Sequence, residues 1–145
     1  MTALQVIDKN VLTDTLLSLS AITDLVGDGQ TPIAYKIYWE HVPQETELPY
    51  ITLHHIMGGR DKNKAYSDTT WKIVGHTANI ITAQSLANAI SQLDHLDPVT
   101  TAYPDVCGFI YIEEYMPIFD RYQVANTPLI MVGGLYRLRL NLVSN

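Results

Sequence analysis

The sequence predicts an α+β domain: a mostly antiparallel sheet with two main helices packed on one face. One segment with helical spacing of apolar residues opens the chain, and another follows three strand-like segments. Because strand-like segments follow one another directly, the strict alternation of strands and helices that a doubly wound fold needs is absent. The 145 residues contain no repeat and no low-complexity linker, so we expect a single domain over residues 1–145.

Apolar periodicity predicts two main helices and one short helical turn. The first helix runs from Gln5 to Leu19, and the turn over Ala21–Val26 follows, with Ser20 as its N-cap and Gly27 as its end. The clearest helix follows Asn79, which is a suitable N-cap. Its apolar stripe consists of Ala83, Leu86, Ala87, Ile90 and Leu93.

Alternating apolar residues predict the strands. Three of them cover Ile33–Trp39, Tyr50–Met57 and Ser67–Thr77, with a polar hairpin tip at residues 58–64 between the last two. Val106–Tyr115 is a further strand, rich in Ile and Tyr. Prolines and a glycine pair predict an irregular segment over Met116–Gly134, with a short strand at residues 129–132. The last strand alternates apolar with polar residues, so one of its faces is wet; its apolar residues are Tyr136, Leu138, Leu140 and Leu142.

Composition narrows the classes of function. The net charge of −6 and the pI of about 5.1 disfavour a nucleic-acid binder, which needs a basic excess. Charged residues make up 17%, against about 25% in ordinary domains, which indicates that a partner covers part of the surface. The single cysteine, Cys107, rules out a disulfide framework. No membrane span and no secretory signal is evident, so we expect folding in a reducing cytoplasm.

The residues able to carry chemistry form no recognisable catalytic motif. His54 and His55 are adjacent, so on a strand they point to opposite faces, and His76 on the next strand can face one of them. Cys107 is expected to be a small buried apolar residue, and the adjacent Glu113 and Glu114 should diverge. We therefore expect no enzymatic activity, no metal and no cofactor. A small metal-dependent enzyme that uses His54 or His55 with His76 is the alternative.

Six charged residues are candidates for contacts with a neighbouring molecule. Three of the nine basic residues, Arg60, Lys62 and Lys64, cluster at the expected hairpin tip. This tip is either simply solvated or an electrostatic arm that reaches an acidic neighbour, because a basic tip on an acidic domain suits self-association. The other candidates lie on strands with a wet face: Glu113, Arg137 and Arg139.

Two short motifs and the order of elements resemble a known family. The motifs are Val42-Pro43-Gln44 and, after it, Leu48-Pro49-Tyr50-Ile51-Thr52-Leu53. They stand in order with a leading helix that ends near Leu25-Val26-Gly27, a strand with Trp71-Lys72-Ile73, and a helix with Ala83-Gln84-Ser85-Leu86-Ala87-Asn88-Ala89-Ile90. From about Val6 to Leu142, the chain resembles the tail-completion, or tail-terminator, proteins of long-tailed bacteriophages.

The resemblance implies a structural virion protein of the tail and neck region, assembled in the host cytoplasm. Its copies would form a six-membered ring that caps the head-proximal end of the tail tube, ends tube polymerisation and joins tail to head. The implied partners are further copies of the chain, the major tail tube protein and a head–tail connector or neck protein. DNA would pass through the lumen without specific binding, since an acidic lining repels it.

Two alternatives stay open within this class. One is another joining protein, such as a head-closure or neck ring, and the other is the terminator of a phage-derived contractile device. The chain also departs from the family pattern between Met116 and Gly134, where the final hairpin is longer.

Overall fold

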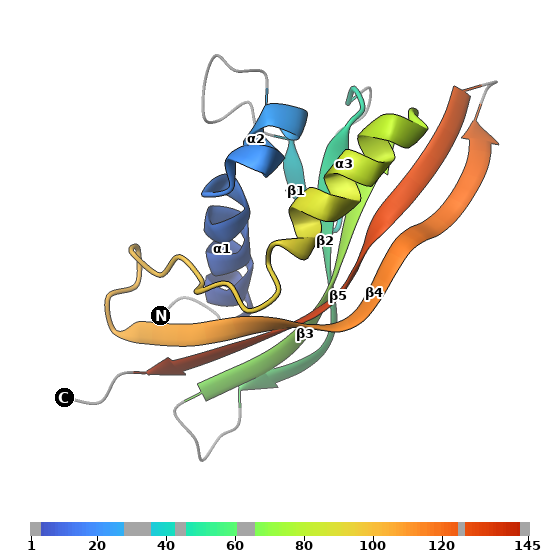
Figure 1. Ribbon diagram of the computed structural model, residues 1–145. Coiled ribbons are helices and arrows are strands. Elements are labelled where there is room, and N and C mark those ends of the chain that lie inside the picture. The colour runs from blue at the N-terminus through green and yellow to red at the C-terminus, as the bar shows by residue number, and fades with distance from the viewer. Residues whose placement is uncertain (1–3, 28–35, 43–45, 61–65, 125–126, 143–145) are drawn as a thin grey trace.

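A five-stranded sheet with strand order β1-β2-β3-β5-β4 forms one layer of the molecule, and three helices form the other (Figure 1). The computed structural model describes residues 4–27, 36–42, 46–60, 66–124 and 127–142, and these counts refer to that part of the chain. The helices are α1 (Leu4–Leu17), α2 (Ser20–Val26) and α3 (Ile80–Ser91). The strands are β1 (Ile37–Trp39), β2 (Tyr50–Arg60), β3 (Tyr66–Thr77), β4 (Val106–Val124) and β5 (Thr127–Leu142).

The predicted α+β class is confirmed. The sheet is mixed, because β1 runs parallel to β2 while β2, β3, β5 and β4 pair antiparallel in that order. The predicted strand over Ile33–Trp39 is described only as β1, since residues 33–35 lie outside the described part. The Leu48–Pro49 peptide bond just before β2 is cis.

The cap predicted for α3 is confirmed. The Asn79 side chain accepts hydrogen bonds from the backbone N–H groups of Ile81 at 2.8 Å and Thr82 at 3.3 Å. These N–H groups have no partner within the helix, so the cap fixes where α3 begins.

The cap predicted for α2 is wrong. Leu19 occupies the N-cap position and makes no side-chain hydrogen bond there, while Ser20 is already helical. Gly27 ends α2 as predicted, and its N–H donates to the Thr23 carbonyl at 3.0 Å. Gly27 has an extended backbone, with φ of −88°, so the helix ends without a left-handed residue.

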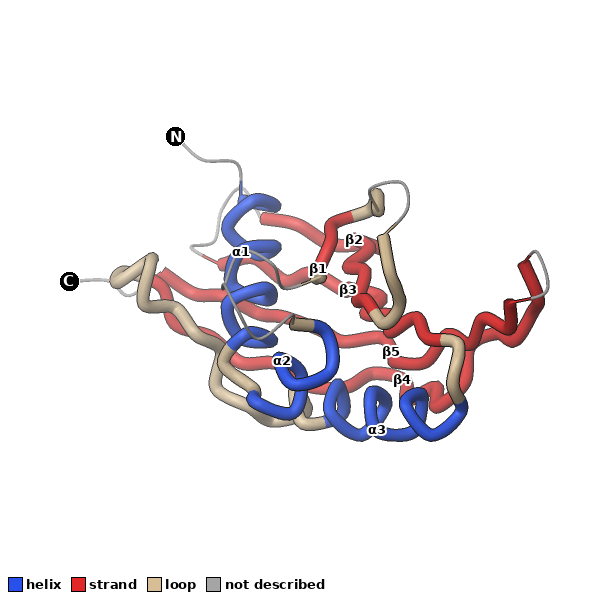
Figure 2. The backbone as a smooth tube through the Cα atoms, turned by 90° about the horizontal axis from the view of Figure 1, so that it is seen from above, coloured by secondary structure: helices blue, strands red, loops and turns tan. Residues whose placement is uncertain are grey.

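The prediction of an irregular segment over Met116–Gly134 is wrong except for its short strand at residues 129–132, which is part of β5. β4 continues to Val124 and β5 begins at Thr127, so the two strands form one long hairpin that projects beyond α3 (Figures 1 and 2). Pro117 lies at the register irregularity between Met116 and Asp120, where no regular ladder bond needs its missing N–H. Cross-strand pairing thus overrides the local preference of these residues.

β2 likewise extends further than predicted, because it continues through Gly58 and Gly59 to Arg60, which pairs with Ser67. The register shifts between His55 and Met57, and Gly58 has a positive φ of 94°, which glycine adopts readily. The remainder of the predicted tip, residues 61–64, lies outside the described residues.

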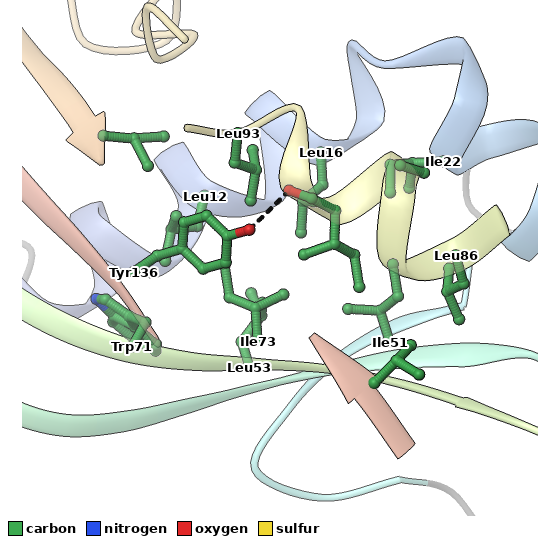
Figure 3. Close-up of a cluster of buried hydrophobic side chains, with 14 of the residues drawn as sticks. Leu12, Leu16, Ile22, Ile51, Leu53, Trp71, Ile73, Leu86, Leu93 and Tyr136 are labelled. Carbon is green, nitrogen blue, oxygen red and sulfur yellow. Dashed lines mark hydrogen bonds between the residues drawn. The ribbon is translucent and has the colours of Figure 1, made fainter. Parts of the chain in front are cut away.

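α1 and α3 pack on the same side of the sheet. Asp8 of α1 reaches Ser67 and Thr69 of β3, and Leu86 of α3 lies against Gly75 of the same strand. Residues 67, 69 and 75 share one face of β3 because side chains alternate along a strand. The core lies between these layers, and within it the Tyr136 hydroxyl donates to the Ile90 carbonyl at 3.2 Å (Figure 3).

Candidate assembly interface on the outer face of the sheet

The side of the sheet that faces away from α1 and α3 is here called the outer face. Within the described part of the chain, no helix lies over it (Figures 1 and 2). Its side chains are aromatic, hydroxylic and charged, a mixture common at surfaces that are partly dry and partly wet. By register they include Tyr50, Thr52 and His54 of β2, Asp68, Lys72 and His76 of β3, Arg137 and Arg139 of β5, and Phe109, Tyr111 and Glu113 of β4.

Arg137 is the centre of an ion-pair cluster on this face. Its Nε and Nη2 donate to the two carboxylate oxygens of Asp68, each at 2.6 Å, and its Nη1 lies 3.4 Å from Glu113 Oε1. The guanidinium also lies over the Tyr111 ring, 5.9 Å from its centroid. The hydrogen bonds to Asp68 and the charge of that carboxylate raise the pKa of Arg137 above its ordinary value. These two hydrogen bonds fix the orientation of the guanidinium relative to the Asp68 carboxylate.

The register of three strands assembles this cluster. Arg137 of β5 lies opposite Thr70 of β3 and Tyr111 of β4, so it contacts Asp68 as a diagonal neighbour. Arg139 lies directly opposite Asp68 and Phe109. Of the residues predicted for an interface, the structure therefore brings Glu113 and Arg137 together and places Arg139 beside them.

A bulge decides where the two adjacent glutamates lie. The β4 register shifts between Ile112 and Glu114, which leaves Glu113 as the extra residue. Glu113 contacts Arg137, and Glu114 pairs with Leu135, two residues before Arg137 on the same face. The register thus places both carboxylates on the outer face, where the sequence predicted divergence, because the bulge interrupts the alternation.

Of the remaining predicted interface residues, the structure describes Arg60. Arg60 is the last residue of β2, and its backbone lies opposite Ser67. Lys62 and Lys64 lie outside the described residues.

A second cluster links histidines across β2 and β3. Thr52 Oγ1 lies 2.9 Å from His76 Nε2 and 3.0 Å from His54 Nε2. Glu40 lies at the other end, with one carboxylate oxygen 3.2 Å from His54 Nδ1 and the other accepting from the His55 N–H at 2.9 Å. A hydroxyl donates only one hydrogen bond, so one imidazole accepts from Thr52 and the other donates to it.

The histidine cluster confirms part of the predicted geometry. His54 and His76 share the outer face, whereas His55 lies on the other side, with its ring 5.3 Å from that of Trp71. Burial, with smaller contributions from the charges of His54 and Lys72, lowers the pKa of His76 to about 4, so its ring is neutral at neutral pH. His76 Nδ1 is buried and has no hydrogen-bond partner among the described residues, and Tyr50 stacks on the ring with the ring centroids 4.6 Å apart.

The order Glu40–His54–Thr52 places a carboxylate, an imidazole and a hydroxyl in sequence, as nucleophilic enzymes do. The Thr52 residue is only 2% exposed, however, and its hydroxyl is shared with His76. In this arrangement no substrate atom can approach the oxygen. Among the described residues, no group of three or more His, Cys, Asp or Glu side chains is placed to hold a metal ion. The contacts of Glu40 with His54 and with the His55 N–H instead hold the segment after β1 against β2.

Cys107 differs from its prediction. It is exposed rather than buried, since it lies opposite Asn141 on the outer face near the start of β4. The sequence places it before an apolar strand but does not show which side of that strand faces the helices.

Comparison with known proteins adds no relative to this picture. No model of a known protein family matches the chain, and no curated protein matches it. No helix in the described residues combines the length and apolar character needed to cross a membrane.

Sequence reasoning missed Asp68, Tyr111, Thr52 and Glu40, which complete the two clusters. Each contact depends on which residues the strand pairing places side by side. The only local signal was the alternation of Arg137 and Arg139 with apolar residues, which correctly indicated an exposed strand face.

Proposed function

We propose that this chain is a structural subunit of a bacteriophage tail, a terminator whose copies form a six-membered ring at the head-proximal end of the tail tube. The ring ends tube polymerisation and joins tail to head. The resemblance of the Val42–Gln44 and Leu48–Leu53 motifs supports this proposal. The mainly antiparallel sheet, with α1 and α3 on one of its faces, is the architecture that the resemblance implies.

The observation that carries the proposal is the outer face of the sheet. Phe109 is 44% exposed there and stacks on Tyr111, with ring centroids 5.7 Å apart, and Arg137 lies next to this pair. Aromatic residues and arginine are the types that dominate the binding energy of protein interfaces. Because they stand on paired strands, they are held in position before any partner arrives, which lowers the cost of binding.

A ring adds two physical requirements. Each subunit must present two different patches, since a head-to-tail contact is what closes a ring. The lumen must let DNA pass, and a chain with a net charge of −6 repels phosphates rather than retaining them.

The test is growth of tail tubes in the presence of this protein. Purified tube protein is polymerised with and without it, and tube ends are imaged by electron microscopy. We expect a ring at one end of each tube and no elongation past it. Unchanged tube growth with bare ends would contradict the proposal, and a ring found only at the neck, away from tube ends, would assign the head-closure alternative.

A matched pair of variants tests the role of the outer face. Phe109→Ser removes an exposed ring from that face, and Ile81→Ser removes a 71%-exposed side chain from the start of α3. We expect Phe109→Ser to weaken capping and Ile81→Ser to leave it unchanged, with both proteins melting like the original. Equal capping by the two variants would exclude this face as the contact.

A further inference from the structure

The β4 side of the sheet ends in an edge that is covered over only part of its length. The Ile110 carbonyl accepts from the His95 N–H at 2.9 Å, and the Ile112 N–H donates to Asp94 Oδ1 at 2.8 Å. The turn after α3 therefore takes up the outward-facing backbone groups there. Beyond Glu114, no described strand lies beside β4 on that side. Since Pro117 and the register irregularity interrupt the strand, the regular open part is Asp120–Val124.

The β2 side shows the same division. β1 covers Ile51–Leu53, and the Glu40 carboxylate accepts the His55 N–H at 2.9 Å. Past the register shift after His55, the segment Met57–Arg60 pairs with β3 but has no described strand on its other side. Open strand edges are templates for pairing with another chain, and monomeric proteins protect them.

The two open edges have matching polarity. β2 is antiparallel to β3, β3 to β5 and β5 to β4, so β4 runs opposite to β2. The open edges lie at opposite ends of the sheet, so they meet in antiparallel sense when neighbouring copies share one orientation and are displaced along the strands. That sense gives the more stable ladder.

The charges beside the two open edges differ in sign. β4 carries two acidic residues before its open edge, Glu113 and Glu114, and Asp120 at the start of that edge, where Arg121 follows as the one basic residue. The β2 edge ends at Arg60 and leads to Lys62 and Lys64. Opposite charges on two edges favour their encounter and disfavour the pairing of two like edges.

We infer that the Asp120–Val124 edge of one copy pairs antiparallel with the Met57–Arg60 edge of the next copy. This inference rests on the proposed function, because the proposed ring requires a contact that closes a chain of copies. The two edges differ, so the contact is head-to-tail and each copy uses both. It joins the sheets of neighbouring subunits through backbone hydrogen bonds.

Disulfide cross-linking tests this contact in the full chain. In a Cys107→Ser background, Met57→Cys is combined in turn with a cysteine at each position from 120 to 124. Met57 is 61% exposed, so a cysteine there is accessible. A disulfide needs Cα atoms within about 7 Å, which paired strands satisfy. We expect mild oxidation of at least one double variant to give covalent trimers and larger species.

Single variants and one covered position serve as controls. A protein with one cysteine forms dimers at most, and Met57→Cys combined with Tyr111→Cys, where Asp94 and His95 cover β4, should give no ladder. A melting curve like that of the Cys107→Ser protein shows that each variant folds. No ladder from any double variant would overturn the inference, as would efficient dimers from a β4 cysteine alone, which would indicate β4–β4 pairing.

The result of the cross-linking experiment can be distinguished from the result of the tube-capping experiment that tests the proposed function. Covalent ladders without capped tubes would support the edge contact and refute the tail role. Capped tubes without ladders would support the tail role and refute the edge contact.

Discussion

The imidazole of His76 lies half-buried beside Tyr50 and Thr52, where loss of hydration lowers its pKa from 6.5 to about 4. The unfolded chain therefore takes up a proton below pH 6.5 that the folded protein refuses until about pH 4. The contribution of His76 to the free energy of unfolding is therefore greatest above pH 6.5 and is lost as the pH falls from 6.5 to about 4. Partial exposure of the ring keeps the loss to about 2 kcal/mol.

The variant His76→Gln isolates this contribution, because glutamine does not titrate and can keep a hydrogen bond to Thr52. We expect the free energy of unfolding of the original protein to fall by about 2 kcal/mol more than that of the variant between pH 7 and pH 4. Urea denaturation at a series of pH values measures both. Parallel pH profiles would show that His76 titrates as it does in water.

Asp8 is the second such group, with the opposite sign. Burial raises its pKa above 3.8, although hydrogen bonds from Thr69 and Ser67 and the charge of His55 oppose this. The folded protein thus binds the proton more readily than the unfolded chain, so stability falls as the pH rises through the raised pKa. Once ionised, the buried carboxylate carries a desolvation cost that the two hydroxyls only partly offset.

Asp8→Asn removes the charge and keeps the shape. Relative to the original protein, the variant should gain stability progressively as the pH rises from 3.8 through the raised pKa of Asp8. Ser67→Ala is the companion variant: it removes a donor to the carboxylate and should steepen the loss with rising pH. A constant difference between Asp8→Asn and the original protein at all pH values would refute this assignment.

Among the elements, α3 packs close to the sheet because Gly75 of β3 has no side chain. A Cβ there would collide with Leu86, lying 2.6 Å from its Cγ and 3.3 Å from Ile90 Cδ1. Gly75→Ala should therefore push the helix away and cost about 1–3 kcal/mol. Leu86→Ala should cost about 2–5 kcal/mol, because it leaves a cavity in the core.

The double variant Gly75→Ala/Leu86→Ala is the decisive measurement. The new methyl enters the space that Leu86 leaves, so the combined loss should be smaller than the sum of the single losses by at least about 1 kcal/mol. Denaturation of the four proteins gives this coupling. Additive losses would mean that the two residues do not touch.

Local signals explain which elements could be predicted. α3 combines an apolar stripe with the Asn79 cap, and both are properties of a short stretch of sequence. The second half of the β4–β5 hairpin has no such signal, since Pro117, Pro128 and Gly133 indicate turns. What makes it a strand is pairing between β4 and β5, which no local pattern reveals.

Like the elements, the candidate interface was predictable only where a local pattern of residues determines it. Arg137 and Arg139 follow from simple alternation, so their exposed face could be predicted. The contacts of Glu113 and the exposure of Cys107 depend on a bulge and on which edge β4 occupies. These properties arise from how strands far apart in sequence align, and a single residue inserted in one strand changes them.

At the scale of the whole molecule, the proposed assembly predicts that charge separation governs how copies meet. The chain is acidic overall, yet three of its nine basic residues, Arg60, Lys62 and Lys64, follow one another at the end of β2. Copies of an acidic protein repel each other at long range, so a local basic segment is needed to orient one against the acidic part of another. A merely solvated segment would have no such effect on assembly.

Replacing these three residues by glutamine distinguishes the two cases, since it changes the net charge from −6 to −9. A matched control, Gln84→Glu/Ser85→Glu/Asn88→Glu on the exposed side of α3, also changes the net charge to −9. If each lost ion pair contributes about 0.5 kcal/mol, capping of tube ends should weaken about tenfold in the first variant only. We expect both proteins to melt like the original, and the three altered positions of the control are exposed.

Ionic strength provides the independent check on this prediction. Above about 0.5 M salt, the Debye length is less than about 5 Å, so exposed charges interact only at short range. The original protein should then lose most of its advantage in capping over the glutamine variant. Capping measured across a salt series would then converge for the two proteins, while the α3 control follows the original throughout. An equal deficit in the control would mean that total charge, and not the position of the basic segment, controls assembly.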